Sequence, residues 1–204
     1  YVPKEMPETS NRLFNNHLVS QIYPLLLAAK GRAFILSTSI KSMNEIKSLL
    51  EDEFEKNNVN YPIFIQGAGS KIKLLEQFKH HGNAVLIGSL SFWEGVDVRG
   101  ENLSLVIIDK LPFQSPGDPI FESKINMLSA KGINAFMTFQ LPKAIISLKQ
   151  GAGRLIRDEL DKGVLMICDQ RIVSKPYGKR FWQSLPSFKR TRNQEDVIEF
   201  LKHL

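Results

Sequence analysis

Two arginines and a glutamine stand at helical spacing in the last third of the chain. Gln150, Arg154 and Arg157 occupy positions i, i+4 and i+7, so on a helix they share one face. Two planar guanidiniums on one face can hold phosphate oxygens through paired N–H donors, and Gly153 has no side chain to hold off an approaching phosphate. The spacing therefore favours a phosphate-binding site. The alternative is an exposed basic helix face that ends in a salt bridge with an acidic residue at 158–159.

A second polar cluster directly follows a short apolar run. Ser89 can donate a hydrogen bond to phosphate, while Glu94 and Asp97 are acceptors for a ribose, a water or an arginine. Gly95 suits a tight turn with positive φ. The cluster is a candidate binding loop, and the alternative is a plain loop with a packed aromatic pair at 92–93.

Short apolar runs alternate with segments of helical periodicity along the chain. This alternation is typical of a parallel sheet that helices cover on both faces. The segment 110–137 contains three prolines and is expected to be irregular. The expected strands are 33–36, 62–65, 84–87, 105–108 and 164–168, and the expected helices are 10–30, 43–56, 70–80, 139–155 and 194–204.

Polar side chains follow several of the expected strands. In open parallel sheets, functional loops lie at the carboxyl ends of the strands. We therefore expect one edge of the sheet to carry the binding residues. These clusters are Ser37-Thr38-Ser39, Gln66-Gly67, the segment 89–97 and the segment 169–171.

Composition narrows the class of protein. The 204 residues fit one α/β domain with an insertion, and a net charge of +6 is a weak indication of an anionic partner. Cys168, the only cysteine, excludes an internal disulfide and a four-cysteine metal site; we expect it to be a small buried apolar side chain and expect no metal site. The apolar runs are too short to span a bilayer, so a cytoplasmic setting is expected. The chain begins at Tyr1 without a signal peptide and is interpreted as a fragment.

The two polar clusters resemble known helicase motifs. The sequence Trp-Glu-Gly-Val-Asp at 93–97 is similar to motif V, and 150–157 is similar to motif VI, of superfamily 2 helicases. The stretch 33–39 resembles motif IV. The stretch 107–113, with Pro116-Gly117-Asp118-Pro119 after it, resembles the DinG branch, which is related to the XPD group. The resemblance covers essentially the whole chain.

The resemblance implies a RecA-like fold of the P-loop NTPase type, with three layers. Residues 1–204 would be the second, C-terminal RecA-like domain, with 111–137 inserted in it, and the first domain is absent from this chain. ATP with Mg²⁺ would lie between the two domains. Motif VI would supply Arg154 and Arg157 as arginine fingers, with Gln150 beside them. Glu94, Gly95, Asp97 and Gly153 would lie on the nucleotide side.

The resemblance also implies a DNA partner. Family members typically unwind duplexes in the 5′ to 3′ direction and act in DNA repair, and many hold an iron–sulfur cluster in the first domain. This chain would contribute part of the single-stranded DNA groove, act as a monomer and contact its own N-terminal RecA-like domain. The candidate DNA contacts are Ser37, Thr38, Ser39, Gln66, Ser89 and Lys110.

A complete nucleotide site is missing from the sequence. No Gly-x-x-x-x-Gly-Lys-Ser/Thr string occurs, and the glycine-rich segment 67–71 lacks its spacing. The chain alone is therefore expected to be inactive as an ATPase, which argues against a self-contained phosphoryl-transfer enzyme. The alternative function is a non-catalytic RecA-like module that binds nucleic acid or a partner protein; the intact set Gln150, Arg154 and Arg157 argues against it.

Overall fold

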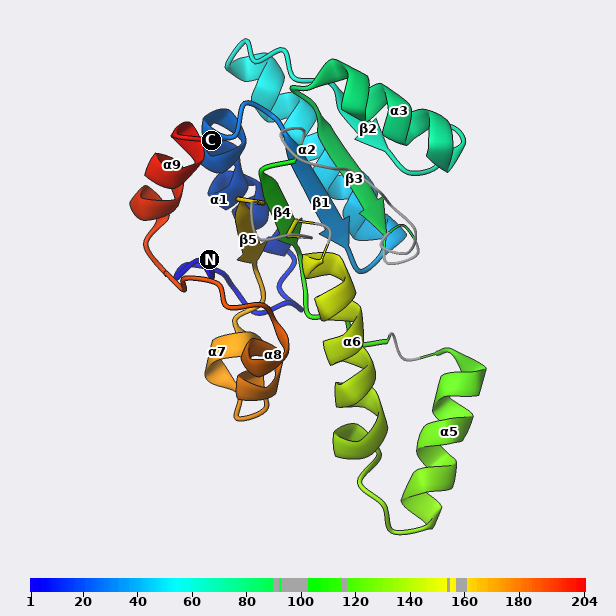
Figure 1. The fold of residues 1–204 in the computed structure, drawn as a ribbon. Coiled ribbons are helices and arrows are strands. Elements are labelled where there is room, and N and C mark those ends of the chain that lie inside the picture. Colours follow the sequence, from blue (N-terminus) through cyan, green and yellow to red (C-terminus); the bar gives the residue numbers. More distant parts are fainter. Residues whose placement is uncertain (90–91, 93–102, 115–116, 154, 157–160) are drawn as a thin grey trace.

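Five parallel strands form the centre of the computed structural model (Figure 1), which describes residues 1–89, 92, 103–114, 117–153, 155–156 and 161–204. Their order across the sheet is β2-β3-β1-β4-β5, and every neighbouring pair is parallel. The parallel sheet expected from the apolar runs is thus confirmed. The strands are β1 (Ala33–Ser37), β2 (Ile63–Ile65), β3 (Val85–Ser89), β4 (Leu105–Ile108) and β5 (Val164–Ile167).

Helices cover both faces of the sheet and give three layers. Within β1, Phe34 and Leu36 point into one hydrophobic cluster, and Ala33 and Ile35 point into the other. The cluster that contains Ile35 is closed by α1 (Phe14–Ala28), α2 (Ile40–Lys56) and α9 (Gln194–Lys202). The opposite cluster is closed by α3 (Lys71–His81), α6 (Leu141–Ala152), α7 (Arg171–Ser174) and α8 (Gly178–Ser184). The buried side chains include Cys168, as expected.

The helix ends follow local capping rules. Ser39 and Ser70 are the N-caps of α2 and α3, and each side chain accepts a backbone N–H from three residues on. The chain leaves α1 through Gly31, which has a φ of +84° and donates its N–H to the Leu26 carbonyl. Helix α1 begins at Phe14, later than the expected start at residue 10.

The expectation of an irregular segment from 110 to 137 is wrong for its centre. Residues Pro119–Ala130 form helix α5. Asp118 caps this helix by accepting the N–H groups of Ile120 and Phe121, and Pro119 occupies the first turn, where a missing N–H costs nothing. A π-helical turn, Phe136–Gln140, then leads directly into α6.

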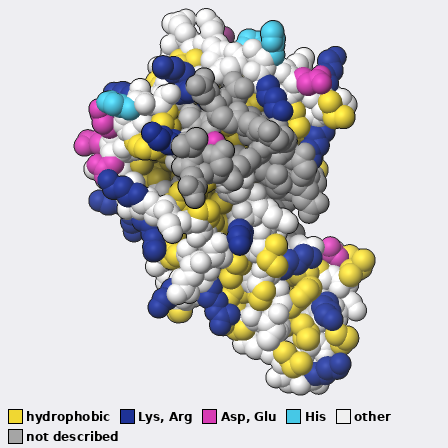
Figure 2. Space-filling view, in the orientation of Figure 1, with side chains coloured by type: hydrophobic (Ala, Val, Ile, Leu, Met, Phe, Trp, Pro, Cys, Tyr) yellow, Lys and Arg dark blue, Asp and Glu magenta, His cyan; other side chains and the backbone are white. Residues whose placement is uncertain are grey.

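Helix α5 extends away from the sheet beside the start of α6 (Figure 1). Phe121 is its one buried side chain, and its ring lies 5.1 Å from that of Phe139. The outer surface of this region is rich in apolar side chains, which Figure 2 shows below the sheet; Ile120 is 84% exposed. None of the described helices is both long and apolar enough to cross a bilayer.

Candidate functional site

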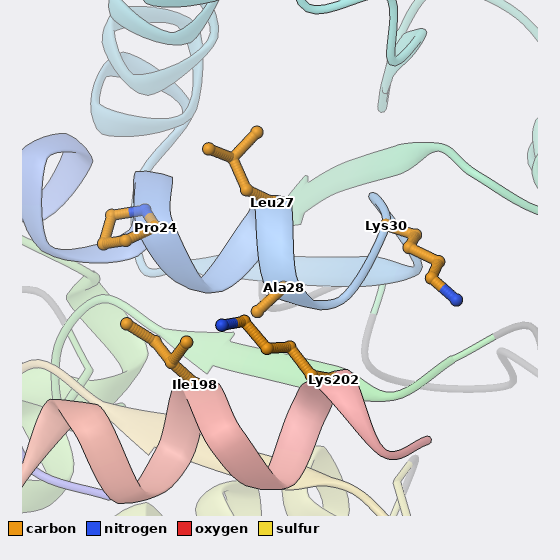
Figure 3. Close-up of a pocket in the computed structure, with 6 residues that line it drawn as sticks. All are labelled: Pro24, Leu27, Ala28, Lys30, Ile198 and Lys202. Carbon is orange, nitrogen blue, oxygen red and sulfur yellow. The ribbon is translucent and has the colours of Figure 1, made fainter.

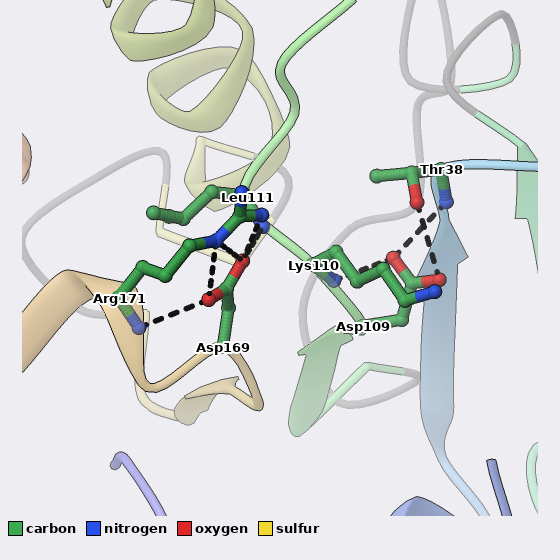
Figure 4. Close-up of polar contacts among 6 residues, drawn as sticks. All are labelled: Thr38, Asp109, Lys110, Leu111, Asp169 and Arg171. Carbon is green, nitrogen blue, oxygen red and sulfur yellow. Dashed lines mark hydrogen bonds and ion pairs between the residues drawn. The ribbon is translucent and has the colours of Figure 1, made fainter. Parts of the chain in front are cut away.

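Two buried carboxylates follow directly after neighbouring strands at the carboxyl edge of the sheet. Asp109 comes after β4 and Asp169 comes after β5, and both side chains are fully inaccessible to solvent. Figure 4 shows them side by side, each turned toward backbone N–H groups of the loops around it. Buried carboxylates are stable only with several hydrogen-bond donors, and here the donors come from several loops.

Asp109 joins the loop after β1 to the loop after β4. One oxygen, Oδ1, accepts the backbone N–H groups of Thr38 at 3.0 Å and Lys110 at 2.6 Å. The other, Oδ2, accepts the hydroxyls of Ser37 at 2.9 Å and Ser42 at 3.2 Å. The carboxylate therefore fixes the end of β1 and the start of α2 relative to β4.

Burial is the strongest influence on the charge of Asp109. Removal from water raises the pKa of this carboxyl from 3.8 to about 6. Hydrogen bonds from Ser37, Thr38 and Lys110 and the positive charge of Lys110 act in the opposite direction, and they are too weak to cancel the effect of burial. Asp109 is therefore ionised at neutral pH but takes up a proton only slightly below it.

Asp169, which lies after β5, joins the end of that strand to the segment that follows β4. It accepts the backbone N–H of Leu111 at 2.9 Å and binds the Arg171 guanidinium, with 2.6 Å between Asp169 Oδ2 and Arg171 Nη2. The hydrogen bond to Asp169 raises the pKa of Arg171, which stays charged. The same guanidinium lies 5.4 Å from the ring centroid of Phe113, so the pair connects β5 to the segment that leads to α5.

The candidate DNA contacts Gln66 and Ser89 are brought together. Gln66 Oε1 accepts the backbone N–H of Ser89 at 2.7 Å and its hydroxyl at 2.8 Å, so the loops after β2 and β3 are tied to each other. The Lys110 ammonium lies 4.8 Å from the centroid of the Phe14 ring. All these residues lie at the carboxyl edge, where the sequence places them.

The three hydroxyl residues at and after the end of β1 differ in accessibility. Ser37 is fully buried and bonded to Asp109, Thr38 is half-buried, and Ser39 is exposed at the start of α2. Of the three, Thr38 and Ser39 are the ones that reach the surface. Their roles as DNA contacts stay a prediction.

The candidate catalytic segment lies at the end of α6. Gln150 is exposed in the last turn, and Gly153 follows the helix with a φ of −66°. Helix α6 ends at Ala152, so the expected helix to residue 155 is too long. Of the three residues expected to share one helix face, only Gln150 lies within α6. The candidates Glu94, Gly95, Asp97, Arg154 and Arg157 lie outside the described residues.

Three of the residues that organise this edge, Asp109, Asp169 and Arg171, were not singled out as candidates from the sequence. Asp109 lies within the stretch 107–113, which was noted only for its resemblance to the DinG branch. Asp169 and Arg171 lie within the polar cluster 169–171 and were given no role of their own. The signal that would have found them is a carboxylate placed immediately after an entirely apolar strand. Among the described residues, no three His, Cys, Asp or Glu side chains gather in a way that would hold a metal ion.

A pocket lies elsewhere, between α1 and α9 (Figure 3). Its volume is about 370 Å³. It lies beside the carboxyl-terminal end of α1, which leads into the amino end of β1, so it belongs to the opposite edge of the sheet. None of the candidate site residues lines it; the lining residues are Pro24, Leu27, Ala28, Lys30, Ile198 and Lys202.

The chain is similar to known helicases over most of its length. A family model described as a helicase C-terminal domain matches residues 22–188. The chain is 46% identical over 202 residues to the ATP-dependent DNA helicase YoaA of Haemophilus influenzae, covering 99% of this chain and 31% of that protein. It is 36% identical over 186 residues to the ATP-dependent helicase DinG of Mycobacterium tuberculosis, covering 91% of this chain and 27% of that protein. The chain thus spans less than a third of the length of these relatives.

Solved structures share the fold. An XPD helicase superimposes with a TM-score of 0.66 at 22% identity, over 90% of this chain and 33% of that one. Xpd4 of S. tokodaii superimposes with a TM-score of 0.65 at 14% identity, over 92% of this chain and 36% of that one. These likenesses confirm a RecA-like helicase fold.

Proposed function

Because the chain belongs to the helicase C-terminal domain family, of the type found in DinG and XPD helicases, we propose that it is the C-terminal motor half of an ATP-dependent DNA helicase. The match of residues 22–188 to that family carries the proposal. The similar YoaA and DinG proteins are about three times longer, which leaves room for the first RecA-like domain that would bind ATP and Mg²⁺. With one cysteine, this chain cannot supply the four thiolates of an iron–sulfur cluster, so any such cluster belongs to another part of the protein.

The nucleotide side of the domain is the segment after α6. Arg154 and Arg157 act as fingers that stabilise the charge developing on the γ-phosphoryl group of ATP held by the first domain. Gln150 and Gly153, at the end of α6, contact the same nucleotide. Glu94, Gly95 and Asp97 complete this side and respond to the state of the nucleotide.

The DNA side is the carboxyl edge at β2, β3, β1 and β4. Thr38, Ser39, Gln66, Ser89 and Lys110 bind phosphates of single-stranded DNA without reading its sequence. Support comes from their common edge and from the net charge of +6, which favours a polyanion. Ser37, although a candidate contact, is buried, and we assign it to holding Thr38 in place. The intact protein translocates in the 5′ to 3′ direction, as a monomer in the cytoplasm.

The catalytic assignment is tested by steady-state ATP hydrolysis in the full-length protein with saturating single-stranded DNA. Arg154→Ala and Arg157→Ala should each lower kcat by about 100-fold or more, with a smaller effect on ATP binding. Lysine at either position should rescue poorly, because a point charge does not reproduce the planar fork. Arg12→Ala, at an exposed arginine on the approach to α1, is the matched control and should leave turnover unchanged.

The 204-residue chain alone should show no DNA-stimulated turnover. Thermal melts of each variant exclude unfolding as the cause of a loss. Turnover within a few-fold of wild type in both finger variants would show that the end of α6 is not catalytic. That result would instead favour a non-catalytic RecA-like module that binds nucleic acid or a partner.

A further inference from the structure

Asp109 holds together the surface on which the proposed DNA side is built. Its carboxylate contacts the end of β1 through Ser37 and Thr38, the start of α2 through Ser42, and the backbone at Lys110. Through Ser42 the network reaches α1, because the Ser42 hydroxyl also lies 3.0 Å from Asn15 Oδ1. The end of β1, the start of α2 and the segment after β4 thus converge on one carboxylate, and α1 is connected to it through Ser42.

The hydrogen-bond pattern shows which part of this arrangement needs a negative charge. Oδ1 accepts two backbone N–H groups, which an amide oxygen can also accept, although more weakly than a carboxylate. Oδ2 accepts three hydroxyls, the longest contact being that of Thr38 at 3.4 Å. Two of them have other acceptors in reach: the Ser39 carbonyl lies 3.2 Å from Ser37 Oγ, and Asn15 Oδ1 lies 3.0 Å from Ser42 Oγ. A neutral side chain of the same shape therefore fits the fold, but only a carboxylate attracts all of these hydroxyls at once.

The charge on Asp109 is unfavourable for folding. Burial raises the pKa of Asp109 from 3.8 to about 6, so ionisation of this carboxyl is less favourable in the folded chain than in the unfolded chain. The neighbouring charged or titratable groups that face it are Lys110 beside it, Glu45 on α2, which binds Asn15, and Cys168 and Asp169 at the end of β5. Of these, Lys110 favours the ionised form of Asp109.

We propose that Asp109 is a positioning residue, whose ionised carboxylate fixes the loop 37–39 and the backbone at Lys110 in the geometry that binds the phosphates of single-stranded DNA. The inference rests on the proposed DNA side of the domain. A buried negative charge also repels phosphate, which would give the opposite effect. The geometry favours positioning, because Asp109 is completely buried and its oxygens are enclosed by donors from the loops themselves.

The experiment compares full-length wild type, Asp109→Asn and Asp52→Asn. Asp52 is an exposed carboxylate on α2, so its variant makes the same chemical and charge change away from the site. Fluorescence anisotropy with a labelled oligo-dT strand at fixed ionic strength measures Kd from pH 5.5 to 8.0. At pH 7.5, Asp109→Asn should bind about tenfold more weakly than wild type, since charge-assisted hydrogen bonds are about twice as strong as neutral ones. Asp52→Asn should follow wild type.

The pH profile distinguishes positioning from a general effect on the fold. The ratio of the Kd of Asp109→Asn to that of wild type should fall toward one as the pH drops through about 6, where wild type becomes neutral at this position. Any effect of pH that is common to the two proteins cancels in the ratio. Thermal unfolding at pH 7.5 should show Asp109→Asn to be the more stable protein, whereas a purely structural role would lower both stability and affinity.

A second variant keeps the test decisive if Asp109→Asn does not fold. Ser37→Ala removes one donor that lowers the pKa of Asp109, so the pH at which DNA affinity falls should move upward. No such move, or Asp109→Asn affinity equal to or tighter than that of wild type, overturns the positioning role. If wild type binds DNA and depends on its arginine fingers, such a result leaves the proposed function standing. If wild type binds no DNA, the proposed DNA side and this inference both fall.

Discussion

Replacing Asp109 with asparagine should stabilise the chain at neutral pH. The folded chain holds Asp109 with a pKa of about 6, against 3.8 without the fold. A difference of this size corresponds to about 3 kcal/mol of free energy. The folded chain is destabilised by this amount when Asp109 is ionised, compared with when it is neutral. Asparagine has the shape of the neutral acid and cannot ionise. We therefore expect Asp109→Asn to raise the free energy of unfolding by about 1 to 3 kcal/mol at pH 7.5, with the upper figure as a ceiling.

The increase in unfolding free energy caused by Asp109→Asn should grow as the pH rises. Because the folded state binds the Asp109 proton more tightly than the unfolded chain, the stability of wild type falls as the pH rises from about 4 to about 6. Above this pH range the ionised carboxylate lowers the stability of wild type by its full amount. Below the range Asp109 is protonated in both the folded and the unfolded chain. The difference in unfolding free energy between variant and wild type should therefore vanish below about pH 3, be small near pH 4 and reach its plateau above about pH 7.

Urea denaturation of the 204-residue chain, followed by far-UV circular dichroism at pH 4.5, 5.5, 6.5 and 7.5, measures this difference. Equal m-values in the two proteins confirm that the change lies in stability and not in the compactness of either state. Asp52→Asn serves as the control and should stay close to wild type at every pH, because its carboxylate is exposed. An Asp109→Asn chain that is less stable than wild type at pH 7.5 would refute the reasoning, since it would mean that the hydrogen bonds outweigh burial.

Two further predictions concern stability. Gly31→Ala should cost about 2 kcal/mol or more in urea denaturation, because the residue has a φ of +84° and an added Cβ would lie 2.7 Å from the Asn83 carbonyl carbon; Gly82→Ala, with a φ of +70° and open space around it, should cost only about 1 kcal/mol. Equal losses in the two would show that the contact with Asn83 is unimportant. Arg171→Ala should cost about 1 to 3 kcal/mol, because it leaves the buried carboxylate of Asp169 with fewer donors. An Arg171→Ala chain with wild-type stability would mean that the backbone N–H groups of Leu111 and of residue 171 are enough to satisfy that carboxylate.

The strands could be predicted from the sequence because their signal is local. A strand covered on both faces needs consecutive apolar side chains, and the run at 105–108 has the same bounds as β4. Helix ends with a strong cap were equally clear: Ser70 caps α3, and Gly31 ends the turn after α1. Each of these depends on residues a few positions apart, so no knowledge of the fold is required.

The segment around α5 shows where local signals mislead. Three prolines between 110 and 137 favour irregular structure when they are counted as helix breakers. Pro119 instead follows the cap Asp118 and begins a helix of 12 residues, because proline is tolerated in the first turn. At the end of α6 the same kind of signal predicts too much helix. The apolar periodicity continues to Leu155, which is buried, but the helix ends at Ala152.

The sequence placed the polar residues of the candidate site at one edge, and only the tertiary structure decided which of them meet. Asp109 lies 67 to 72 residues from Ser37, Thr38 and Ser42, and its bonds to them exist because β1 and β4 are neighbours in the sheet. The roles of Arg154 and Arg157 rest on sequence and family. A motif fixes the type and spacing of side chains along the chain. The burial of a carboxylate, its donors and therefore its charge depend on which strands pair, and that pairing is a property of the whole fold.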